Sequence, residues 1–544
     1  MKILIIGLDA ATMELIEPWA AAGHLPALAR LMHEGASGRL ISTPNMHSAS
    51  AWTSILTGLN PGRHGLFVFS DRNFATGRQE FFKGGDRAGR IVGDYLAQHN
   101  LTSGFLNVPM TYPAHAAPGS FMISGLDAPA LNESAFCPAT LRNEVFSRFP
   151  DYAFTPVGLG DLMKAGRIGD AISAWLRLTE TQTAVAEYLI ETYPTDFFMT
   201  VFTASDWAGH NVWKYAAASS PGEKSDSLQF RDSLRRIYES LDAAVARLLA
   251  YADGRTQVYV ISDHGMGQHS GAAYHLAEWL EGRGYMVRHQ SAPPRASLMN
   301  TGRRVAKNLL PVAIKEKIKS RLGAERVKEL QAAEKDAFYD SIDWSRSRAY
   351  TEPGRHVINI NLAGRNPQGI VAGADYDSVC AEIIAALSEW QDAHGAAVVE
   401  RVARRDEVYA GPFVERASDL YVYWNPQAAF GEPPEEVKAR GFWWSGDHRL
   451  EGILIARGPG LAPGARFPAP FVHDLLPTVM YAAGLPVPGD LDGQVIRQAF
   501  SEAHTAANPL RIAEAMDETT SEGGALSGAE EEMIEEKLRS LGYL

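Results

Sequence analysis

Acidic and imidazole side chains follow several short apolar runs of the chain, and these residue types bind divalent metal ions. Asp9 follows the run KILIIGL, Asp206 and His210 follow FFMTVFT, and Asp263 and His264 follow QVYVIS. Carboxylates and imidazoles without thiolates suit zinc or manganese, and a site with open coordination positions is catalytic rather than structural. These positions therefore predict a catalytic metal site.

Each of these residues also has a simpler interpretation when it is taken alone. Asp206 and His210 are four residues apart, so on a helix they would share one face and could bind one ion, but most such pairs are surface residues. Asp9 and Asp263 could each cap a following helix. The prediction of a metal site therefore depends on the conjunction of these groups at several strand ends.

The segment TPNMHSASAWTSILTG supplies hydroxyl groups that could act as a nucleophile. Ser48 precedes a predicted helix that begins near Ala49, where the positive end of the helix dipole favours an alkoxide and a bound phosphoryl group. Coordination to a divalent metal can deprotonate such a hydroxyl. By chemistry alone Ser50, Thr53 and Ser54 compete with Ser48, and a helix N-cap is the alternative role for Ser48.

The elements that would position these residues alternate between strands and helices. Amphipathic stretches at 170–192 and 225–251 predict helices, and four apolar runs predict buried strands at Lys2–Leu8, Phe197–Thr203, Gln257–Ser262 and Gly452–Ala456. This alternation predicts an α/β fold with a mostly parallel sheet that helices cover on both faces. Ligands of such sheets bind outside the carboxyl ends of the strands, so we expect the acidic and imidazole groups to meet at one edge.

Composition narrows the class of protein. The chain has 544 residues, 46% of them hydrophobic, and a formal net charge of −13, which argues against nucleic-acid binding. Its two cysteines, Cys137 and Cys380, exclude a disulfide framework and a cysteine-rich zinc module. Asp9 interrupts the opening apolar run before it is long enough for a signal peptide. No stretch approaches the roughly 18 apolar residues of a membrane span. We therefore expect a cytoplasmic protein without a transmembrane segment.

The order of the motifs resembles the alkaline phosphatase superfamily. Asp9 comes first, followed by Ser48 upstream of WTSILTGLNPGRHG, and then by the motifs D-x-x-x-H at 206–210, SDHG at 262–265 and GDH at 446–448. The chain looks closest to the type I phosphodiesterase/nucleotide pyrophosphatase branch and to the bacterial phosphohydrolase/phosphomutase-like proteins beside it. The resemblance spans residues 1 to 500, and the set of motifs is far more specific than any single one.

This resemblance implies two divalent metal ions, with zinc favoured over manganese, and a serine nucleophile. In the family the nucleophile stands nine residues before the threonine of a Thr-Gly pair, and counting back from Thr57 gives Ser48. One ion would be held by Asp206, His210 and His448. The second would be held by Asp9, Asp263 and His264, with Ser48 bridging toward it.

The domain organisation that we expect has a core, an insert and a tail. The catalytic core would comprise residues 1–287 and 345–500, and residues 501–544 would form an acidic tail with a final helix that starts at a Ser527/Glu530 capping box. A basic helical insert or cap is predicted at 288–344, because residues 288–336 contain 12 Lys/Arg against 5 Asp/Glu. We favour a solvated face for these charges over a lid for an anionic substrate or a membrane contact.

In two places this sequence differs from related families, and both differences bear on which substrate the protein would accept. Ser48-Ala-Ser-Ala lacks the proline and arginine of the sulfatase motif, which argues against a sulfatase. The nucleotide pyrophosphatases have a threonine nucleophile and an asparagine that binds phosphoryl oxygens shortly after the His-Gly pair. This chain has a serine, and Phe69 lies near the position of that asparagine. Asn107 is a candidate replacement for that asparagine.

These patterns predict a metal-dependent phosphohydrolase that acts on a small phosphate ester. We favour a phosphodiesterase that works through Ser48 and a covalent phospho-enzyme intermediate. A phosphotransferase or mutase on the same site is the alternative enzyme, and a non-catalytic binding protein of the same fold is the alternative from another class. Retention of all six ligand positions and a hydroxyl argues against the non-catalytic alternative.

Overall fold

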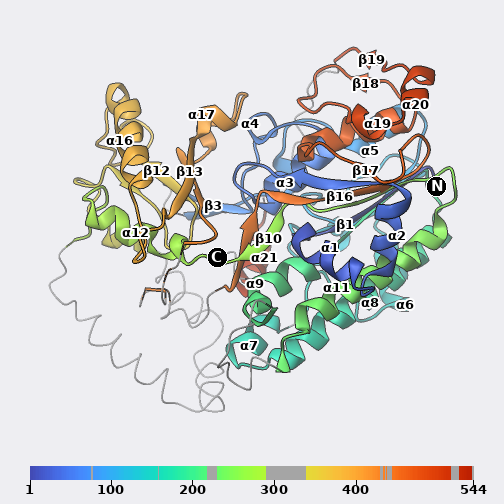
Figure 1. Cartoon of the computed structure of the whole chain (residues 1–544), viewed down its shortest axis with the longest axis horizontal. Coiled ribbons are helices and arrows are strands. Elements are labelled where there is room, and N and C mark those ends of the chain that lie inside the picture. Colours follow the sequence, from blue (N-terminus) through green and yellow to red (C-terminus); the bar gives the residue numbers. More distant parts are fainter. Residues whose placement is uncertain are drawn as a thin grey trace. The chain divides into compact units, whose positions relative to one another are not determined.

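In the computed structural model, the chain forms two compact units (Figure 1). Unit 1 comprises residues 1–270, 405–417 and 435–544, and unit 2 comprises residues 271–404 and 418–434. The structure describes residues 1–74, 78–156, 158–216, 229–289, 338–428, 430, 433–434, 437, 444–515 and 526–541.

Unit 1 is built around a nine-stranded sheet. In spatial order the strands are β17 (Ala465–Arg466), β2 (Ala36–Ile41), β16 (Glu451–Arg457), β9 (Gln257–Ile261), β1 (Ile3–Leu8), β8 (Phe197–Phe202), β5 (Ser103–Val108), β6 (Phe121–Ser124) and β7 (Phe136–Cys137). The five strands from β9 to β6 are parallel to one another, whereas β16 is antiparallel to both β9 and β2. The prediction of a mostly parallel sheet is therefore confirmed.

Alternate residues of the central strand β1 enter two separate apolar cores. Leu4, Ile6 and Leu8 pack in one core, while Ile3 and Ile5 pack in the other. Successive side chains of a strand point to opposite faces, so a continuous apolar run is what a strand needs when helices cover both faces.

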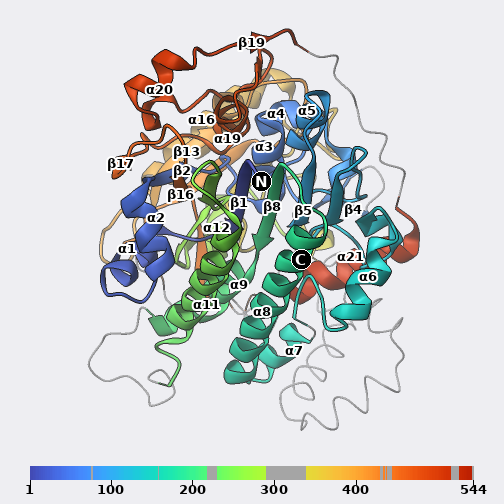
Figure 2. The same ribbon diagram turned by 90° about the vertical axis from the view of Figure 1, so that its right-hand side faces the viewer.

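Helices cover both faces of this sheet. The core around Leu4 includes residues of α1 (Met13–Ala21), α2 (Pro26–Glu34), α6 (Leu141–Arg148), α8 (Ile168–Thr192), α9 (Ala204–Ala216) and α11 (Ser233–Leu248). The core around Ile3 includes residues of α3 (Ser48–Thr57), α5 (Val92–Gln98) and α19 (Leu475–Ala482). Figure 2 shows α8 and α11 running side by side across strands β1 and β8. Helix coverage of both faces is also confirmed.

The strands and helices predicted from the sequence form close to their expected bounds. All four apolar runs are strands. The stretch at 170–192 lies within α8, and the stretch at 225–251 contains α11. Smaller elements of unit 1 are α4 (Pro61–His64), α7 (Leu159–Lys164), α17 (Arg405–Val408), α20 (Glu502–Ala507) and the strand pairs β3 (Ser70–Asn73)–β4 (Arg78–Phe81), β10 (Gly265–Gln268)–β15 (Gly446–Arg449) and β18 (Val487–Pro488)–β19 (Ile512–Ala513).

The predicted final helix is α21 (Gly528–Leu541), and the Ser527/Glu530 capping box begins it. The Ser527 backbone N–H donates to a Glu530 carboxylate oxygen at 2.9 Å, and the Glu530 N–H donates to the Ser527 hydroxyl at 3.3 Å. Ile534 and Leu538 of this helix are buried in the core around Leu4. Helix α21 is thus packed against the core around Leu4.

Unit 2 has its own small antiparallel sheet. The strand order is β11 (Ala349–Tyr350), β12 (Val357–Ile360), β14 (Leu420–Trp424) and β13 (Val399–Arg404), and α12 (Ala272–Gly282) and α16 (Tyr376–Ser388) belong to the same unit. Residues 290–337, which make up most of the predicted basic insert, lie outside the described residues. In the described part of the chain, no helix combines the length and apolar character needed to cross a membrane.

Candidate active site

Three parallel strands deliver the predicted acidic residues to one edge of the sheet. Asp9 follows β1, Asp206 lies in the first turn of α9 after β8, and Asp263 follows β9. Hydrogen bonds tie these strand ends together: the Ala10 N–H donates to the Asp263 carboxylate at 3.2 Å, and the Ser205 hydroxyl donates to the Asp9 carbonyl at 2.6 Å. The shared strand direction therefore brings distant segments to one place.

Strand β15, which pairs antiparallel with β10, carries His448 to the same edge. His448 lies opposite Met266 of β10, and β10 directly follows His264. A Cβ on Gly446 would lie 2.3 Å from the Gly209 carbonyl oxygen, so only glycine allows β15 to approach α9 this closely. The approach places the imidazole of His448 beside the imidazole of His210, with their Nε2 atoms 2.8 Å apart.

Ser48 is the first residue of α3, and its side chain is buried. The helix cap is His47, whose ring Nδ1 accepts the Ala49 N–H at 3.2 Å, so Ser48 does not have the capping role that was its alternative. The Ser48 hydroxyl instead lies 3.1 Å from Nε2 of His264. The edge of the sheet that carries Asp9, Asp206 and Asp263 is called the acidic edge below. The start of α3 thus brings a hydroxyl group to the acidic edge.

Each of the three histidines turns its Nδ1 toward a backbone carbonyl. Nδ1 of His210 is 3.0 Å from the Gly446 carbonyl, Nδ1 of His264 is 3.1 Å from the Gly265 carbonyl, and Nδ1 of His448 is 2.6 Å from the Met46 carbonyl. A carbonyl only accepts, so each Nδ1 carries the proton and each Nε2 presents a lone pair. Such backbone contacts orient metal-binding histidines.

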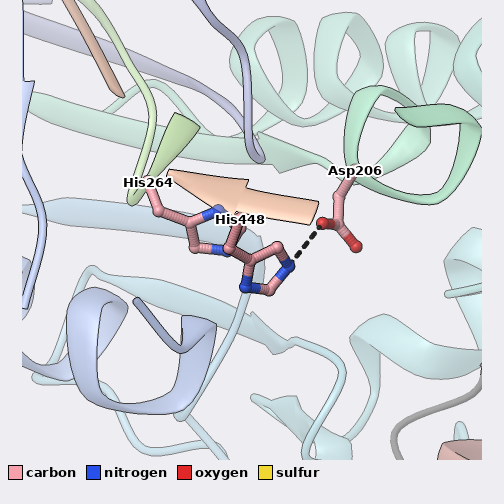
Figure 3. Close-up of side chains that lie close together, drawn as sticks. All are labelled: Asp206, His264 and His448. Carbon is pink, nitrogen blue, oxygen red and sulfur yellow. Dashed lines mark ion pairs between the residues drawn. The ribbon is translucent and has the colours of Figure 1, made fainter. Parts of the chain in front are cut away.

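The first cluster contains Asp206, His210 and His448. Oδ1 of Asp206 is 3.3 Å from Nε2 of both His210 and His448. Donor atoms bound about 2.0–2.1 Å from one tetrahedral zinc ion lie roughly 3.3 Å apart, so these distances fit a shared ion. Two facing Nε2 lone pairs would otherwise repel each other. Figure 3 shows Asp206 directed toward His448, with His264 beside it.

The second cluster contains Asp9, Asp263 and His264, and all three side chains are buried. Nε2 of His264 is 3.3 Å from Oδ2 of Asp263 and 3.9 Å from Oδ1 of Asp9. Neither of these carboxylate oxygens has a hydrogen-bond partner among the described residues. His264 also lies close to Asp206 and His448, so it belongs to both possible metal-binding groups.

The electrostatics of the second cluster favour a cation. Burial raises the pKa of Asp9 well above its ordinary value, and the charges of Asp263 and Asp206 raise it further. Burial also raises the pKa of Asp263 to about 6, and it lowers the pKa of His264 well below its ordinary value. Two carboxylates that disfavour a second negative charge, beside a neutral imidazole, form a site that a divalent cation would stabilise.

Asp206 is ionised more readily than the other two carboxylates. Burial opposes its charge, but His210 and His448 lower its pKa well below the ordinary value. Burial likewise opposes the charge of His448, whose pKa Asp206 nevertheless raises. The residues of both clusters therefore fit the carboxylate and imidazole chemistry of a divalent metal site.

The competing hydroxyls contact their own helix or loop. Thr53 donates to the Ala49 carbonyl at 2.7 Å, which is the ordinary bond of a threonine within a helix. Ser50 contacts Thr43 and Asn45, and Ser54 lies 3.0 Å from His64. Among these four hydroxyls and the described residues, only that of Ser48 lies within hydrogen-bond distance of a residue of the two clusters.

Sequence reasoning missed a tryptophan that contacts the site. Trp52 donates its indole N–H to Oδ2 of Asp9 at 3.2 Å. Gly7 makes room for this ring, because a Cβ at that position would lie 2.6 Å from it. Trp52 stands four residues after Ser48 and therefore lies on the same face of α3, which is the signal that could have identified it.

Comparisons with known proteins agree with this architecture. The family model for type I phosphodiesterase/nucleotide pyrophosphatase matches residues 3–448. No curated protein matches the chain. Similar solved structures include an inactive form of murine ectonucleotide pyrophosphatase/phosphodiesterase 5 in complex with AMP, at 11% identity and a TM-score of 0.51, which covers 92% of this chain and 100% of its own.

A second similar structure is phosphonoacetate hydrolase from Sinorhizobium meliloti 1021 in complex with phosphonoacetate. It is 14% identical, with a TM-score of 0.50, over 89% of this chain and 95% of its own. At these identities the two likenesses show the fold alone. The family model, in contrast, covers more than half of the sequence. The chain therefore belongs to the type I phosphodiesterase/nucleotide pyrophosphatase family.

Proposed function

We propose that this protein is a metal-dependent phosphohydrolase, and specifically a phosphodiesterase, with Ser48 as the nucleophile. The observation that carries the proposal is the position of the Ser48 hydroxyl, 3.1 Å from Nε2 of His264 at the start of α3. His264 belongs to both clusters of buried carboxylates and imidazoles. Membership in the phosphodiesterase family supports a hydrolase that acts on phosphate esters.

Ser48 would carry out the bond-forming step. Its Oγ forms a bond to phosphorus while the bond from phosphorus to the leaving oxygen breaks, and the proton lost by the serine hydroxyl is balanced by the one that the leaving alcohol takes up. A diester substrate gives a seryl phosphodiester, and a monoester gives a phosphoseryl enzyme. Water then attacks phosphorus, the bond to Ser48 breaks, and a proton from that water returns to the serine. The N-terminus of α3 favours the negative charge of both the alkoxide and the phosphoryl group.

The clusters would bind two divalent ions, with zinc favoured over manganese. Asp206, His210 and His448 would hold one ion, and Asp9, Asp263 and His264 would hold the other beside Ser48. Bound ions of this kind lower the pKa of a coordinated hydroxyl and stabilise the oxygens of an in-line displacement. The indole of Trp52 would orient Asp9, and the backbone carbonyls on Nδ1 would orient the three histidines.

We propose a small phosphate ester as substrate rather than a nucleic acid, because the net charge is −13. A cytoplasmic location remains a prediction from the sequence, and fractionation of expressing cells would test it.

The test of the proposal couples metal analysis to an ester panel. Protein purified without chelator is measured for zinc and manganese, and its turnover of p-nitrophenyl phosphate is compared with that of bis-p-nitrophenyl phosphate. We expect about two ions per chain and faster turnover of the diester. A protein that binds no transition metal after reconstitution would overturn the mechanism, and one that prefers the monoester would overturn the assignment as a phosphodiesterase.

A further inference from the structure

Strand β5 is interrupted by a bulge at Asn107, near its carboxyl end. The register with β6 shifts between Leu106 and Val108, and Asn107 has a φ of 60°. Leu106 faces one apolar core and Val108 the other, so Asn107 is the extra residue between them. Asparagine tolerates this left-handed conformation, and bulges beside active sites redirect a side chain.

The Asn107 carboxamide is buried and only half satisfied. Its side chain is 4% exposed, and its oxygen accepts a hydrogen bond from the hydroxyl of the fully buried Tyr152. The amino group has no hydrogen-bond partner among the described residues. A buried donor without an acceptor is destabilising, so a ligand that supplies an acceptor would recover that free energy.

The position of Asn107 in the sheet places it toward the edge that carries the acidic residues. Strand β5 is parallel to β8, with Leu106 opposite Thr200, so Asn107 lies near the carboxyl end of β5, at the edge from which α9 and Asp206 also start. Orphan acceptors at this edge, on Asp9 and Asp263, suit a cation. An orphan donor at the same edge suits an anionic oxygen.

The loop after Asn107 is held rigidly, as a substrate contact requires. The buried carboxylate of Asp127 accepts the backbone N–H groups of Met110 and Tyr112 at 2.8 Å and of Gly84 at 3.0 Å. These bonds fix the chain that leaves β5, so the bulge presents a preorganised donor.

The position at which related pyrophosphatases carry a phosphoryl-binding asparagine offers no donor here. Phe69 lies near that position in the sequence, is buried, and packs edge-on against His47 with ring centroids 5.1 Å apart. An aromatic ring next to the residue before Ser48 cannot donate to a phosphoryl oxygen. The donor must therefore come from another element.

We propose that the amino group of Asn107 donates a hydrogen bond to a non-bridging oxygen of the substrate phosphoryl group, with Tyr152 as the residue that positions it. This inference rests on the proposed phosphohydrolase function. It assigns to the β5 bulge the phosphoryl contact that Phe69 has displaced from its place in related proteins.

The experiment compares Asn107→Gly, Asn107→Asp and Asn100→Gly. Glycine suits the left-handed backbone and removes the amide, whereas aspartate keeps the shape and replaces the donor by a negative charge. Asn100→Gly is the matched control, because Asn100 also has a left-handed φ of 56° but is exposed and precedes β5 at the opposite edge. Turnover, inhibition by inorganic phosphate, metal content and Tm are measured for each variant.

We expect Asn107→Gly to lower kcat about 100-fold or more and to weaken phosphate inhibition at unchanged metal content, since loss of one preorganised donor typically has this effect. Asn107→Asp should be at least as impaired, and Asn100→Gly should match the wild type. The proposal fails if Asn107→Gly keeps wild-type kcat, or if only KM rises while phosphate inhibition is unchanged. If Asn107→Gly does not fold, the isosteric Asn107→Asp decides by the same criteria. A wild-type protein that hydrolyses no ester would refute the proposed function itself, which separates the two failures.

Discussion

Ser48 differs from the neighbouring hydroxyls in what it contacts. Its Oγ lies 3.1 Å from a histidine of the acidic edge, whereas the Thr53 hydroxyl bonds to the backbone of its own helix. We expect Ser48→Ala to lower kcat roughly a thousandfold while the metal content stays the same, because the covalent step is lost. Turnover and metal content of the purified variant test this.

Thr53→Ala is the control for that substitution, because it removes a hydroxyl from the same helix. It should change kcat by less than about threefold, since a helix-bonded hydroxyl contributes to packing rather than to chemistry. Ser50→Ala and Ser54→Ala should behave in the same way. Near wild-type turnover by a metal-loaded Ser48→Ala variant would show that water is the nucleophile.

A second residue, His64, should make stability depend on pH. Burial lowers the pKa of His64 to about 3, and its neutral ring accepts the Leu66 N–H while contacting Ser54. The unfolded pKa is about 6.5, so protons bind the unfolded chain first as the pH falls. The stabilisation from neutral His64 is complete above pH 6.5 and declines toward pH 3, by up to about 1.4 kcal/mol per pH unit.

Denaturant unfolding at pH 7, 6 and 5 measures this effect. His64→Gln should show a shallower loss of stability with falling pH than the wild type, although it is less stable at pH 7. His99→Gln, at an exposed position, should keep the wild-type slope. Parallel pH profiles for the wild type and His64→Gln would refute the assignment.

At the scale of elements, helix α9 contributes two residues from one face to the first cluster. Asp206 and His210 are one turn apart, whereas the second cluster comes from the ends of β1 and β9. We therefore expect the double substitution Asp206→Asn with His210→Gln to remove about one metal ion per chain and to leave the other. Elemental analysis decides this, with Lys214→Ala on the same helix as control. Loss of both ions would show that the clusters bind cooperatively rather than separately.

Helix α21 is a second element whose attachment can be tested. Glu530 forms the capping box with Ser527 and accepts the Tyr112 hydroxyl at 2.8 Å. Glu530→Ala should lower the free energy of local opening of α21 by about 1–2 kcal/mol, because both contacts are lost. Hydrogen exchange of the helix amides measures it. The exposed Glu531→Ala in the same turn should change little, and equal effects of the two would refute the role of the cap.

The central strands could be predicted from sequence because their apolar runs are continuous. The direction of β16 relative to its neighbours could not be predicted, because an apolar run such as GILIA is compatible with parallel and antiparallel pairing. The structure places β16 antiparallel to β9. The positions of Asp9, Asp206 and Asp263 followed from the strand ends. The Nδ1 partners of the histidines are backbone carbonyls, such as that of Met46. Every residue has such a carbonyl, so the sequence cannot identify these partners. The bulge at Asn107 likewise depends on packing between two cores.

For the whole molecule, the basic segment 288–336 remains a prediction that concerns the substrate. If it attracts an anion, neutralising several of its lysines and arginines should raise KM severalfold and weaken the dependence of KM on salt. The measurement is KM at low and high salt for the wild type and a charge-neutralised variant. If KM and its dependence on salt are unchanged in the variant, the segment has only a structural role.

The place of β2 in the sheet has a consequence for how the protein is made. β2 lies between β16 and β17, which are both encoded in the last fifth of the chain. During translation, before β16 and β17 are synthesised, both edges of β2 therefore have unpaired backbone groups. Unpaired strand edges can form hydrogen bonds with other chains. Nascent chains that stop before residue 451 should need chaperones and should aggregate when released, whereas chains that reach residue 466 can pair both edges of β2.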